Sequence, residues 1–321
     1  MTPPAQPHAT WPELPLARWQ ETCAALHLWT QIVGKIRLKL TPWLNHSWHV
    51  ALYVTTRGLT TSPIPHGRRT FSIDFDFIDH RLLIATDHGE VRALDLAPRS
   101  VAQFYRAVMA MLNDLGLSVR INQIPNEIPG AVPFGDDAGH ASYDPDFAHR
   151  FWRVLLSSDR VLKQFRTGFI GKCSPVHFFW GSFDLAVTRF SGRTAPLHPG
   201  GVPNLPDTVA CEAYSHEVSS AGFWPGGGAV SDAAFYSYAY PEPSGFRTAR
   251  IAPSAAYFHE ALGEFVLPYD AVRLSPDPEA TLLSFLQSTY DAAATMGNWD
   301  QARLECPFGR PAVPRPLPQP K

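Results

Sequence analysis

Residues 169–196 read FIGKCSPVHFFWGSFDLAVTRFSGRTAP, and they hold the densest group of polar and aromatic side chains in the chain. Residues 32–63 read IVGKIRLKLTPWLNHSWHVALYVTTRGLTTSP. Both stretches place a Gly-Lys pair after a helical pattern and then run through Val-Thr, Arg, Gly, Thr and Pro in the same order. The sequence therefore predicts two copies of one structural unit.

The first copy predicts a helix, four antiparallel strands and a second helix. Apolar side chains recur at helical spacing over residues 18–32, and Gly34 predicts the end of that helix. Ser100 opens a helix that ends at Gly116. Between the helices, alternating, β-branched and aromatic residues predict strands at residues 49–56, 68–77, 81–86 and 91–96.

The second copy predicts a similar but longer series of elements. A helix from Asp146 runs to the Gly171-Lys172 pair, and a last helix covers residues 277–296. Strands are predicted at residues 176–190, 209–223, 234–240 and 264–274, with a short helix at 254–262. The predicted fold class is α+β, made of two pseudo-repeated helix–four-strand antiparallel sheet–helix units that are either separate or merged into one sheet or barrel.

Composition shifts along the chain predict five segments. Pro-rich and aperiodic residues predict a flexible arm and a tail at the two ends, and a Pro-, Gly- and Asp-rich stretch predicts a connector between the units. The predicted boundaries are an arm at 1–15, a first unit at 16–123, a connector at 124–145, a second unit at 146–300 and a Pro-rich tail at 301–321.

The overall composition argues against several classes of function. The formal net charge of the 321 residues is -2, which gives no reason to expect a nucleic-acid surface. No segment approaches the roughly 20 consecutive apolar residues that span a bilayer, and the N-terminus lacks a signal-peptide pattern. The four cysteines form no CxxC pair, so reduced thiols and a cytoplasmic location are expected.

Four stretches of the chain resemble a widespread bacterial family that is known as a domain of unknown function. They are WPELPLARWQETCAALHLWTQIVGKIRL (residues 11–38), TSPIPHGRRTFSIDFDFIDHRL (61–82), FIGKCSPVHFFWGSFDLAVTRFSG (169–192) and YSHEVSSAGFWPGGG (214–228). The resemblance covers nearly the whole chain except its tails. It implies a self-contained soluble protein and assigns no activity to any residue.

His177 and Asp184 are the first candidates for chemistry. If Gly181 introduces a bulge, Asp184 turns toward the strand face that carries His177, despite their odd spacing. The pair would then act as a general base with its orienting carboxylate, or as two metal ligands. The alternative is a core histidine that is hydrogen-bonded to neighbouring backbone.

His216, in the sequence Tyr-Ser-His-Glu, extends this candidate site. If His216 points inward, it completes a set of two histidines and one carboxylate with His177 and Asp184, which suits zinc, iron or manganese. No HxH, HxxxH or HExxH spacing supports that set. His46 and His49 are interpreted as surface and strand-edge residues.

Cationic and aromatic side chains supply candidate substrate contacts. The paired lysines Lys35 and Lys172 either cap helix ends or form an anion site together with Arg57 and Arg189. Trp180 and Trp224 are predicted to wall the pocket. The glycines at 226–228 follow Trp224 and predict either a lid or a simple turn.

The favoured interpretation is an enzyme that acts on a small molecule in a pocket of the second unit, with neither nucleic acid nor membrane as partner. Titratable and aromatic residues converge there beside a Gly-rich loop. One alternative is a non-catalytic ligand-binding or regulatory module in which lysines anchor a carboxylate or phosphate. Another is an interaction protein whose Pro-rich tail engages a partner as polyproline II.

Overall fold

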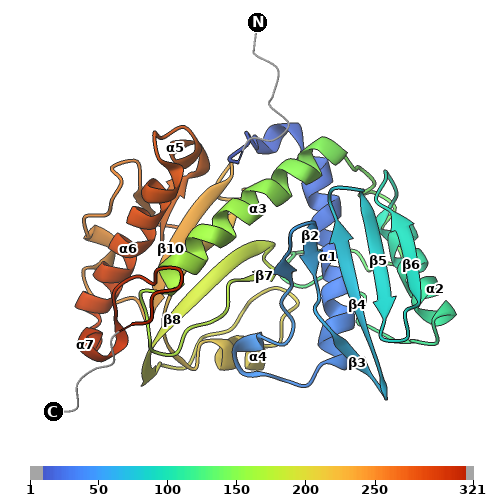
Figure 1. Cartoon of the computed structure of the whole chain (residues 1–321), viewed down its shortest axis with the longest axis horizontal. Helices are drawn as coiled ribbons and strands as arrows, with labels where there is room; N and C mark the ends of the chain where they lie inside the picture. The colour runs from blue at the N-terminus through green and yellow to red at the C-terminus, as the bar shows by residue number, and fades with distance from the viewer. Residues whose placement is uncertain (1–9, 316–321) are drawn as a thin grey trace, which may run out of the picture.

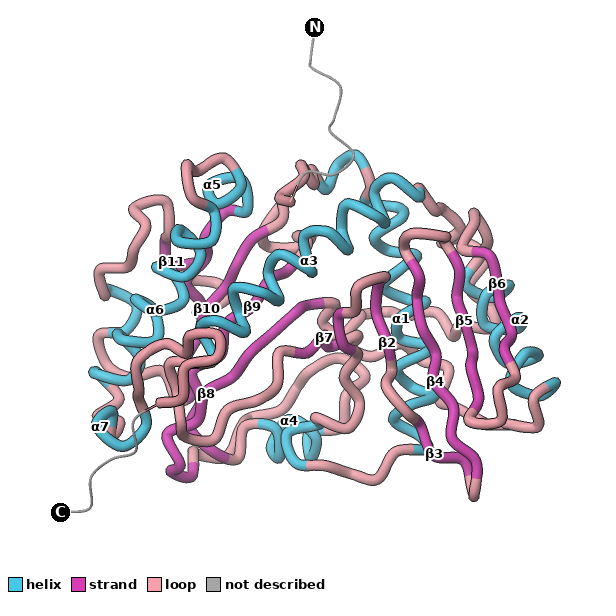
Figure 2. The backbone as a smooth tube through the Cα atoms, in the orientation of Figure 1, coloured by secondary structure: helices cyan, strands magenta, loops and turns pink. Residues whose placement is uncertain are grey.

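The computed structural model of the chain describes residues 10–315, and it has an α+β architecture with two antiparallel sheets (Figure 1). The first sheet has the order β1-β2-β4-β5-β6, with β3 paired to β4, and the second has the order β11-β12-β10-β9-β8-β7. Figure 2 shows the strands of the two sheets in separate groups with helices around them. No helix within residues 10–315 combines the length and the apolar character that a membrane crossing requires.

The first sheet has six strands where four were predicted, because residues 58–66 add two short strands, and β4 follows the alternation of its sequence. In β4, Phe71, Ile73 and Phe75 are buried, while Ser72 and Asp74 are only partly buried. The Ser100 hydroxyl accepts a hydrogen bond from the N–H of Gln103, so the predicted start of α2 is confirmed. The elements of this half are α1 (Gln20–Leu40), β1 (Tyr53–Val54), β2 (Gly58–Thr60), β3 (Ile64–His66), β4 (Arg69–Asp76), β5 (Arg81–Thr86), β6 (Val91–Asp95) and α2 (Val101–Asp114).

The second sheet has one apolar face and one face that is polar and aromatic. The apolar face carries Leu185, Phe223 and Phe235, and it packs against the long helices α3 and α6. The opposite face, here called the open face, carries Asp184 and Tyr236. The elements of this half are α3 (Pro145–Arg166), β7 (His177–Phe179), β8 (Asp184–Thr194), α4 (Asp207–Ala213), β9 (His216–Trp224), β10 (Ala234–Tyr240), β11 (Tyr257–His259), β12 (Glu264–Pro268), α5 (Tyr269–Arg273), α6 (Pro278–Met296) and α7 (Gln301–Leu304).

The two sheets meet at one antiparallel bridge. Leu52, just before β1, and Phe178 of β7 exchange two backbone hydrogen bonds, each 2.8 Å long. Helix α3 crosses the same junction, where the indole N–H of Trp152 donates to the carbonyl of Thr55 at 3.0 Å. The sheets are therefore joined without forming one continuous sheet, and the described residues form no closed barrel.

The predicted duplication is not confirmed, because the two Gly-Lys pairs occupy different structural positions. Gly34 lies inside α1, which continues to Leu40, whereas α3 ends at Arg166, before Gly171. A Cβ atom on Gly34 would lie 2.2 Å from the indole ring of Trp180. This glycine is therefore needed for close packing and does not end its helix as predicted.

Four predicted elements of the second half were wrong, because tertiary pairing and local turns outweigh the sequence pattern. Residues 176–190, predicted as one strand, belong to two strands, β7 and β8, that are joined by a turn at residues 180–183. Residues 209–223 divide into α4 and β9. Residues 254–262 contain β11, which pairs with β12, in place of a short helix. Residues 264–274 form β12 and then α5, and the change of structure comes directly after Pro268.

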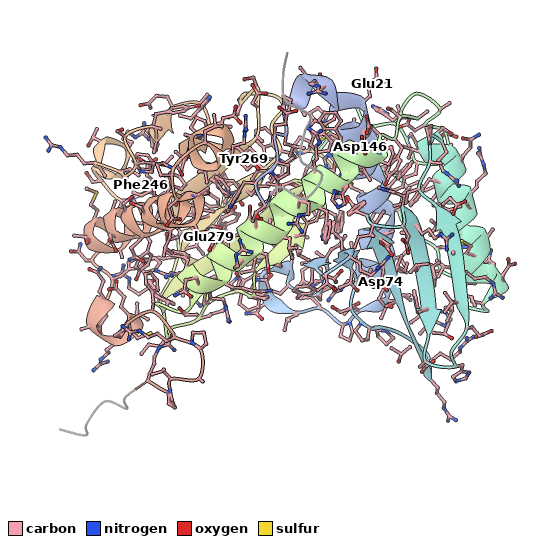
Figure 3. The ribbon with its side chains drawn as sticks, turned by 45° about the horizontal axis from the view of Figure 1, so that its top comes forward. Glu21, Asp74, Asp146, Phe246, Tyr269 and Glu279 are labelled. Carbon is pink, nitrogen blue, oxygen red and sulfur yellow. The ribbon has the colours of Figure 1, made fainter. Side chains whose placement is uncertain are left out.

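Part of the predicted N-terminal arm packs into the protein. Leu14 is buried in the core, and Trp11 lies 6.3 Å from the ring of Phe235. The hydroxyl of Tyr269, which Figure 3 labels, donates to the carbonyl of Pro12 at 2.7 Å. The arm before residue 10 and the end of the Pro-rich tail after residue 315 lie outside the described residues.

Candidate functional site

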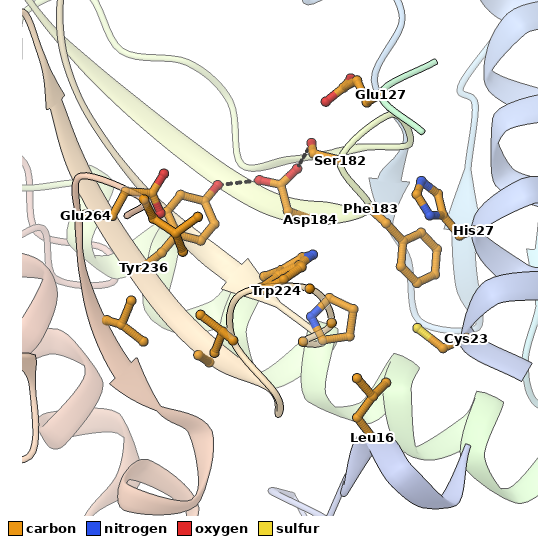
Figure 4. Close-up of a pocket in the computed structure, with 18 of the residues that line it drawn as sticks. Leu16, Cys23, His27, Glu127, Ser182, Phe183, Asp184, Trp224, Tyr236 and Glu264 are labelled. Carbon is orange, nitrogen blue, oxygen red and sulfur yellow. Dashed lines mark hydrogen bonds between the residues drawn. The ribbon is translucent and has the colours of Figure 1, made fainter. Parts of the chain in front are cut away.

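A cavity of about 630 Å³ lies between the N-terminal half of α1 and the open face of the second sheet. Three acidic side chains, Glu127, Asp184 and Glu264, line it, and we call it the carboxyl cavity. Figure 4 shows these side chains around the space, with His27 and Cys23 of α1 on the other side. Both halves of the chain therefore form the walls, which corrects the prediction of a pocket within the second unit alone.

Asp184 is at the centre of the hydrogen bonding in this cavity. Its carboxylate accepts hydrogen bonds from the hydroxyls of Ser182 and Tyr236, as Figure 4 shows. Burial raises the pKa of Asp184, and the two hydroxyl donors oppose that effect. Burial and the Asp184 charge raise the pKa of Tyr236 well above its ordinary value, so the phenol stays protonated and acts as a donor.

The other two carboxyl groups of the cavity, those of Glu127 and Glu264, also have raised pKa values. Burial, assisted by the negative charge of Asp184, raises the pKa of each from 4.5 to about 7. Glu127 is held close to the hairpin turn, since a Cβ atom on Gly181 would lie 1.9 Å from its carboxylate oxygen. At neutral pH each glutamate is therefore divided between its protonated and ionised forms.

The backbone at this site is locally strained. Glu127 and Phe183 both line the cavity, and both have positive φ angles, of 63° and 60°. Non-glycine residues adopt this region rarely, and such positions cluster at functional sites.

Aromatic rings and neutral groups complete the cavity wall. Trp224 and Tyr236 project from neighbouring strands, and the Tyr214 and Tyr238 hydroxyls lie 2.8 Å apart. Burial lowers the pKa of His27 to about 4, so its imidazole is neutral. The described residues that line the cavity include no lysine or arginine. The arrangement thus favours a neutral or cationic ligand over an anionic one.

The structure places His177 on the same sheet face as Asp184, but at a different cavity. His177 pairs with Ala186 and Asp184 pairs with Phe179, so both predicted residues project from the open face. A hairpin between β7 and β8 produces this arrangement in place of the predicted bulge at Gly181. His177 lines a second cavity of about 420 Å³, here called the apolar cavity.

The predicted set of two histidines and one carboxylate is not assembled. His216 begins β9, and its ring lies 6.0 Å from that of His46, toward the end of β8. Within residues 10–315, no group of three or more His, Cys, Asp or Glu side chains is placed to hold a metal ion. His46 and His49 are buried, which corrects their interpretation as surface residues.

The predicted cationic contacts lie in different places, all outside the walls of the carboxyl cavity. The Lys35 ammonium donates to the carbonyl of Ile124 at 2.7 Å, and the Lys172 ammonium donates to His46 Nε2 at 2.6 Å. Arg189 is buried on the apolar face of the second sheet, 3.5 Å above the ring of Phe165. The structure therefore does not assemble the predicted anion site.

The two predicted tryptophans wall different cavities. Trp224 and the glycines at 226–228 line the carboxyl cavity, whereas Trp180 lines the apolar cavity and donates to the carbonyl of Val50 at 2.9 Å. The residues of the carboxyl cavity that were not predicted from the sequence include Glu127, Tyr236 and Glu264. The alternating tyrosines of residues 234–240 held a signal, since strand alternation places Tyr236 and Tyr238 on one face.

Comparisons with known proteins identify the family without adding an activity. No curated protein matches the chain, and no solved structure does. One family model matches residues 11–306, which is nearly the whole sequence. The chain therefore belongs to DUF5996, a family of unknown function.

Proposed function

We propose that this protein is an enzyme that performs acid–base chemistry on a small neutral or cationic molecule in the carboxyl cavity. The observation that carries the proposal is the placement of Glu127 and Glu264 with Asp184 in one cavity. Burial raises the pKa of each glutamate to about 7, which suits proton transfer near neutral pH. Their positions on either side of Asp184 in an aromatic-walled cavity support the same function.

In this proposal the three carboxyl groups have different roles. One glutamate donates a proton to the substrate and the other accepts one, which suits hydrolysis or isomerisation. Asp184, held by Tyr236 and Ser182, orients the substrate and favours a positive charge on it. The strained backbone at Glu127 and Phe183 is consistent with a site whose geometry is fixed in advance.

The proposal also includes a cytoplasmic location and a small-molecule partner. The four cysteines are unpaired, and burial raises the pKa of the Cys23 thiol in the cavity wall to about 12. A thiol with this pKa is a poor nucleophile, so the carboxyl groups carry the proposed chemistry.

Asp184→Asn tests this function directly. We expect the purified wild-type protein to convert at least one compound of a cell metabolite extract, as followed by mass spectrometry. The variant should lower kcat/KM for that compound about 10²- to 10⁴-fold, because it removes the charge beside the two glutamates. Asp114→Asn, at the exposed end of α2, is the matched control and should leave the rate unchanged.

Equal rates for Asp184→Asn and the wild type would contradict the proposal, as would a converted compound with net negative charge. Binding of extract compounds without any conversion would favour the alternative of a non-catalytic ligand-binding module.

A further inference from the structure

The apolar cavity is a second, partly open space over the open face of the second sheet. Its floor includes His177, Phe179 and Phe190, and the segment that contains α4 covers it. Its volume of about 420 Å³ lies within the usual range for small-molecule sites. It shares five wall residues with the carboxyl cavity: Glu127, Gly181, Ser182, Tyr214 and Tyr238.

The imidazole of His177 carries an unused hydrogen-bond acceptor. Its Nδ1 lies 2.7 Å from the carbonyl oxygen of Pro175 and 3.0 Å from that of Ala186. Carbonyls only accept hydrogen bonds, so Nδ1 carries the proton and Nε2 carries a lone pair. The residue is 1% exposed, and Nε2 has no partner among the described residues.

Ser47 adds a second unpartnered polar group at the same cavity. Its hydroxyl oxygen is buried and has no hydrogen-bond partner within residues 10–315. Two other polar residues of the wall, Thr188 and His46, are already paired. The Thr188 hydroxyl lies 2.8 Å from that of Ser220, and both ring nitrogens of His46 have partners. Buried polar atoms without partners are uncommon in native proteins, so these two atoms at one cavity are the groups that a polar ligand would satisfy.

We propose that the apolar cavity binds a second small molecule, which has an aromatic or aliphatic body and a hydroxyl or N–H group that donates a hydrogen bond to His177 Nε2. The body of this ligand packs against Phe179, Phe190 and Trp48. The Ser47 hydroxyl is available for a second polar atom of the ligand.

Two further observations support an uncharged donor as the partner of His177. Burial lowers the pKa of His177 to about 4, so its ring stays neutral at physiological pH. An anionic ligand group would find only lone pairs at Nε2, whereas a hydroxyl or N–H supplies the missing proton. This site differs from the proposed catalytic site in its acceptor, His177, although Glu127 lines both cavities.

Isothermal titration with 2-naphthol and 2-methoxynaphthalene tests this inference, because the two probes share a naphthalene body and a methyl group replaces the donated hydrogen in the second. We expect 2-naphthol to bind the wild-type protein at least about 10-fold more tightly than the ether, as the loss of one buried hydrogen bond requires. In His177→Phe the two probes should bind equally, since the ring remains and the acceptor is removed.

Two more variants locate the binding and separate it from the proposed catalysis. Val209→Trp fills the apolar cavity from α4 and should abolish binding of both probes without changing His177. Glu264→Gln, which lines only the carboxyl cavity, should leave the affinity for 2-naphthol within about twofold of the wild type. If His177→Phe fails to fold, the affinities of the two probes for the wild type and for Val209→Trp still test the inference.

Three results would overturn the inference: equal affinities of the two probes for the wild type, binding that survives Val209→Trp, or no binding of 2-naphthol up to its solubility limit. Each leaves the carboxyl cavity and its proposed chemistry untouched, because Asp184→Asn tests that proposal separately.

Discussion

Glu264→Gln is expected to raise the free energy of unfolding at pH 8 by about 2–3 kcal/mol, although it removes a charged group. The same change at Glu127 should have a similar effect. The physical reason is that burial and the Asp184 charge raise the pKa of each carboxyl from 4.5 to about 7. The folded protein therefore bears the cost of an unfavourable ionisation at pH 8, and glutamine, which resembles the protonated acid, does not.

Because both pKa values are raised in the folded protein, these two glutamates make the folded state less stable as the pH rises. Between pH 4.5 and 7 the folded state binds more protons at these two sites than the unfolded state does. Their contribution to stability is complete below pH 4.5, and it is lost as the pH rises through 7. The gain from Glu264→Gln should thus be large at pH 8 and close to zero at pH 4.5.

Urea denaturation at both pH values measures this difference. Glu260→Gln is a suitable control, because Glu260 is exposed and pairs with Arg247 at 3.2 Å on the surface. That variant should leave the free energy of unfolding nearly unchanged, because exposed ion pairs contribute little to stability. A Glu264→Gln protein that is less stable at pH 8 than the wild type would contradict the shifted pKa. The predicted gain would mean that the acids persist for function at a cost in stability.

Gly34→Ala is expected to lower the free energy of unfolding by about 2 kcal/mol, whereas the same change in an ordinary helix interior adds about 1 kcal/mol. The added Cβ atom would lie 2.2 Å from the Trp180 ring, which is buried and bonded to the Val50 carbonyl. The clash therefore outweighs the gain in helix propensity.

A double-mutant cycle with Trp180→Phe checks the cause. The smaller ring leaves room for the methyl group, so Gly34→Ala should cost much less in the Trp180→Phe background, with a coupling of about 1–3 kcal/mol. Additive effects of the two changes would show that the helix does not depend on this contact. Urea denaturation of the four proteins at one pH gives the answer.

The elements that could be predicted from the sequence are those with a regular period. The alternation of β4 and the cap at Ser100 are local signals, and the structure bears both out. Gly34 shows where local signals fail, because the same residue type ends helices and also admits a neighbouring ring. Only the position of Trp180, 146 residues away in sequence, distinguishes the two uses.

The candidate site was found only in part, for a similar reason. Strand pairing puts His177 and Asp184 on one sheet face, but the packing of α1 and α4 over that face creates two cavities where the sequence suggested one pocket. Glu127 comes from the aperiodic connector, and Glu264 directly follows the turn before β12. No repeating pattern around either glutamate indicates that it lies close to Asp184 in the folded protein.

Both halves of the chain contribute to the wall of the carboxyl cavity, so a ligand in it would link them. The backbone joins the sheets through one bridge, while α1, the connector and the second sheet all contribute to the wall. A molecule that fills this space contacts both halves at once, so its binding stabilises the two halves against separation. Neither fragment of a chain cut within the connector would retain the complete wall, and a ligand would promote their reassembly.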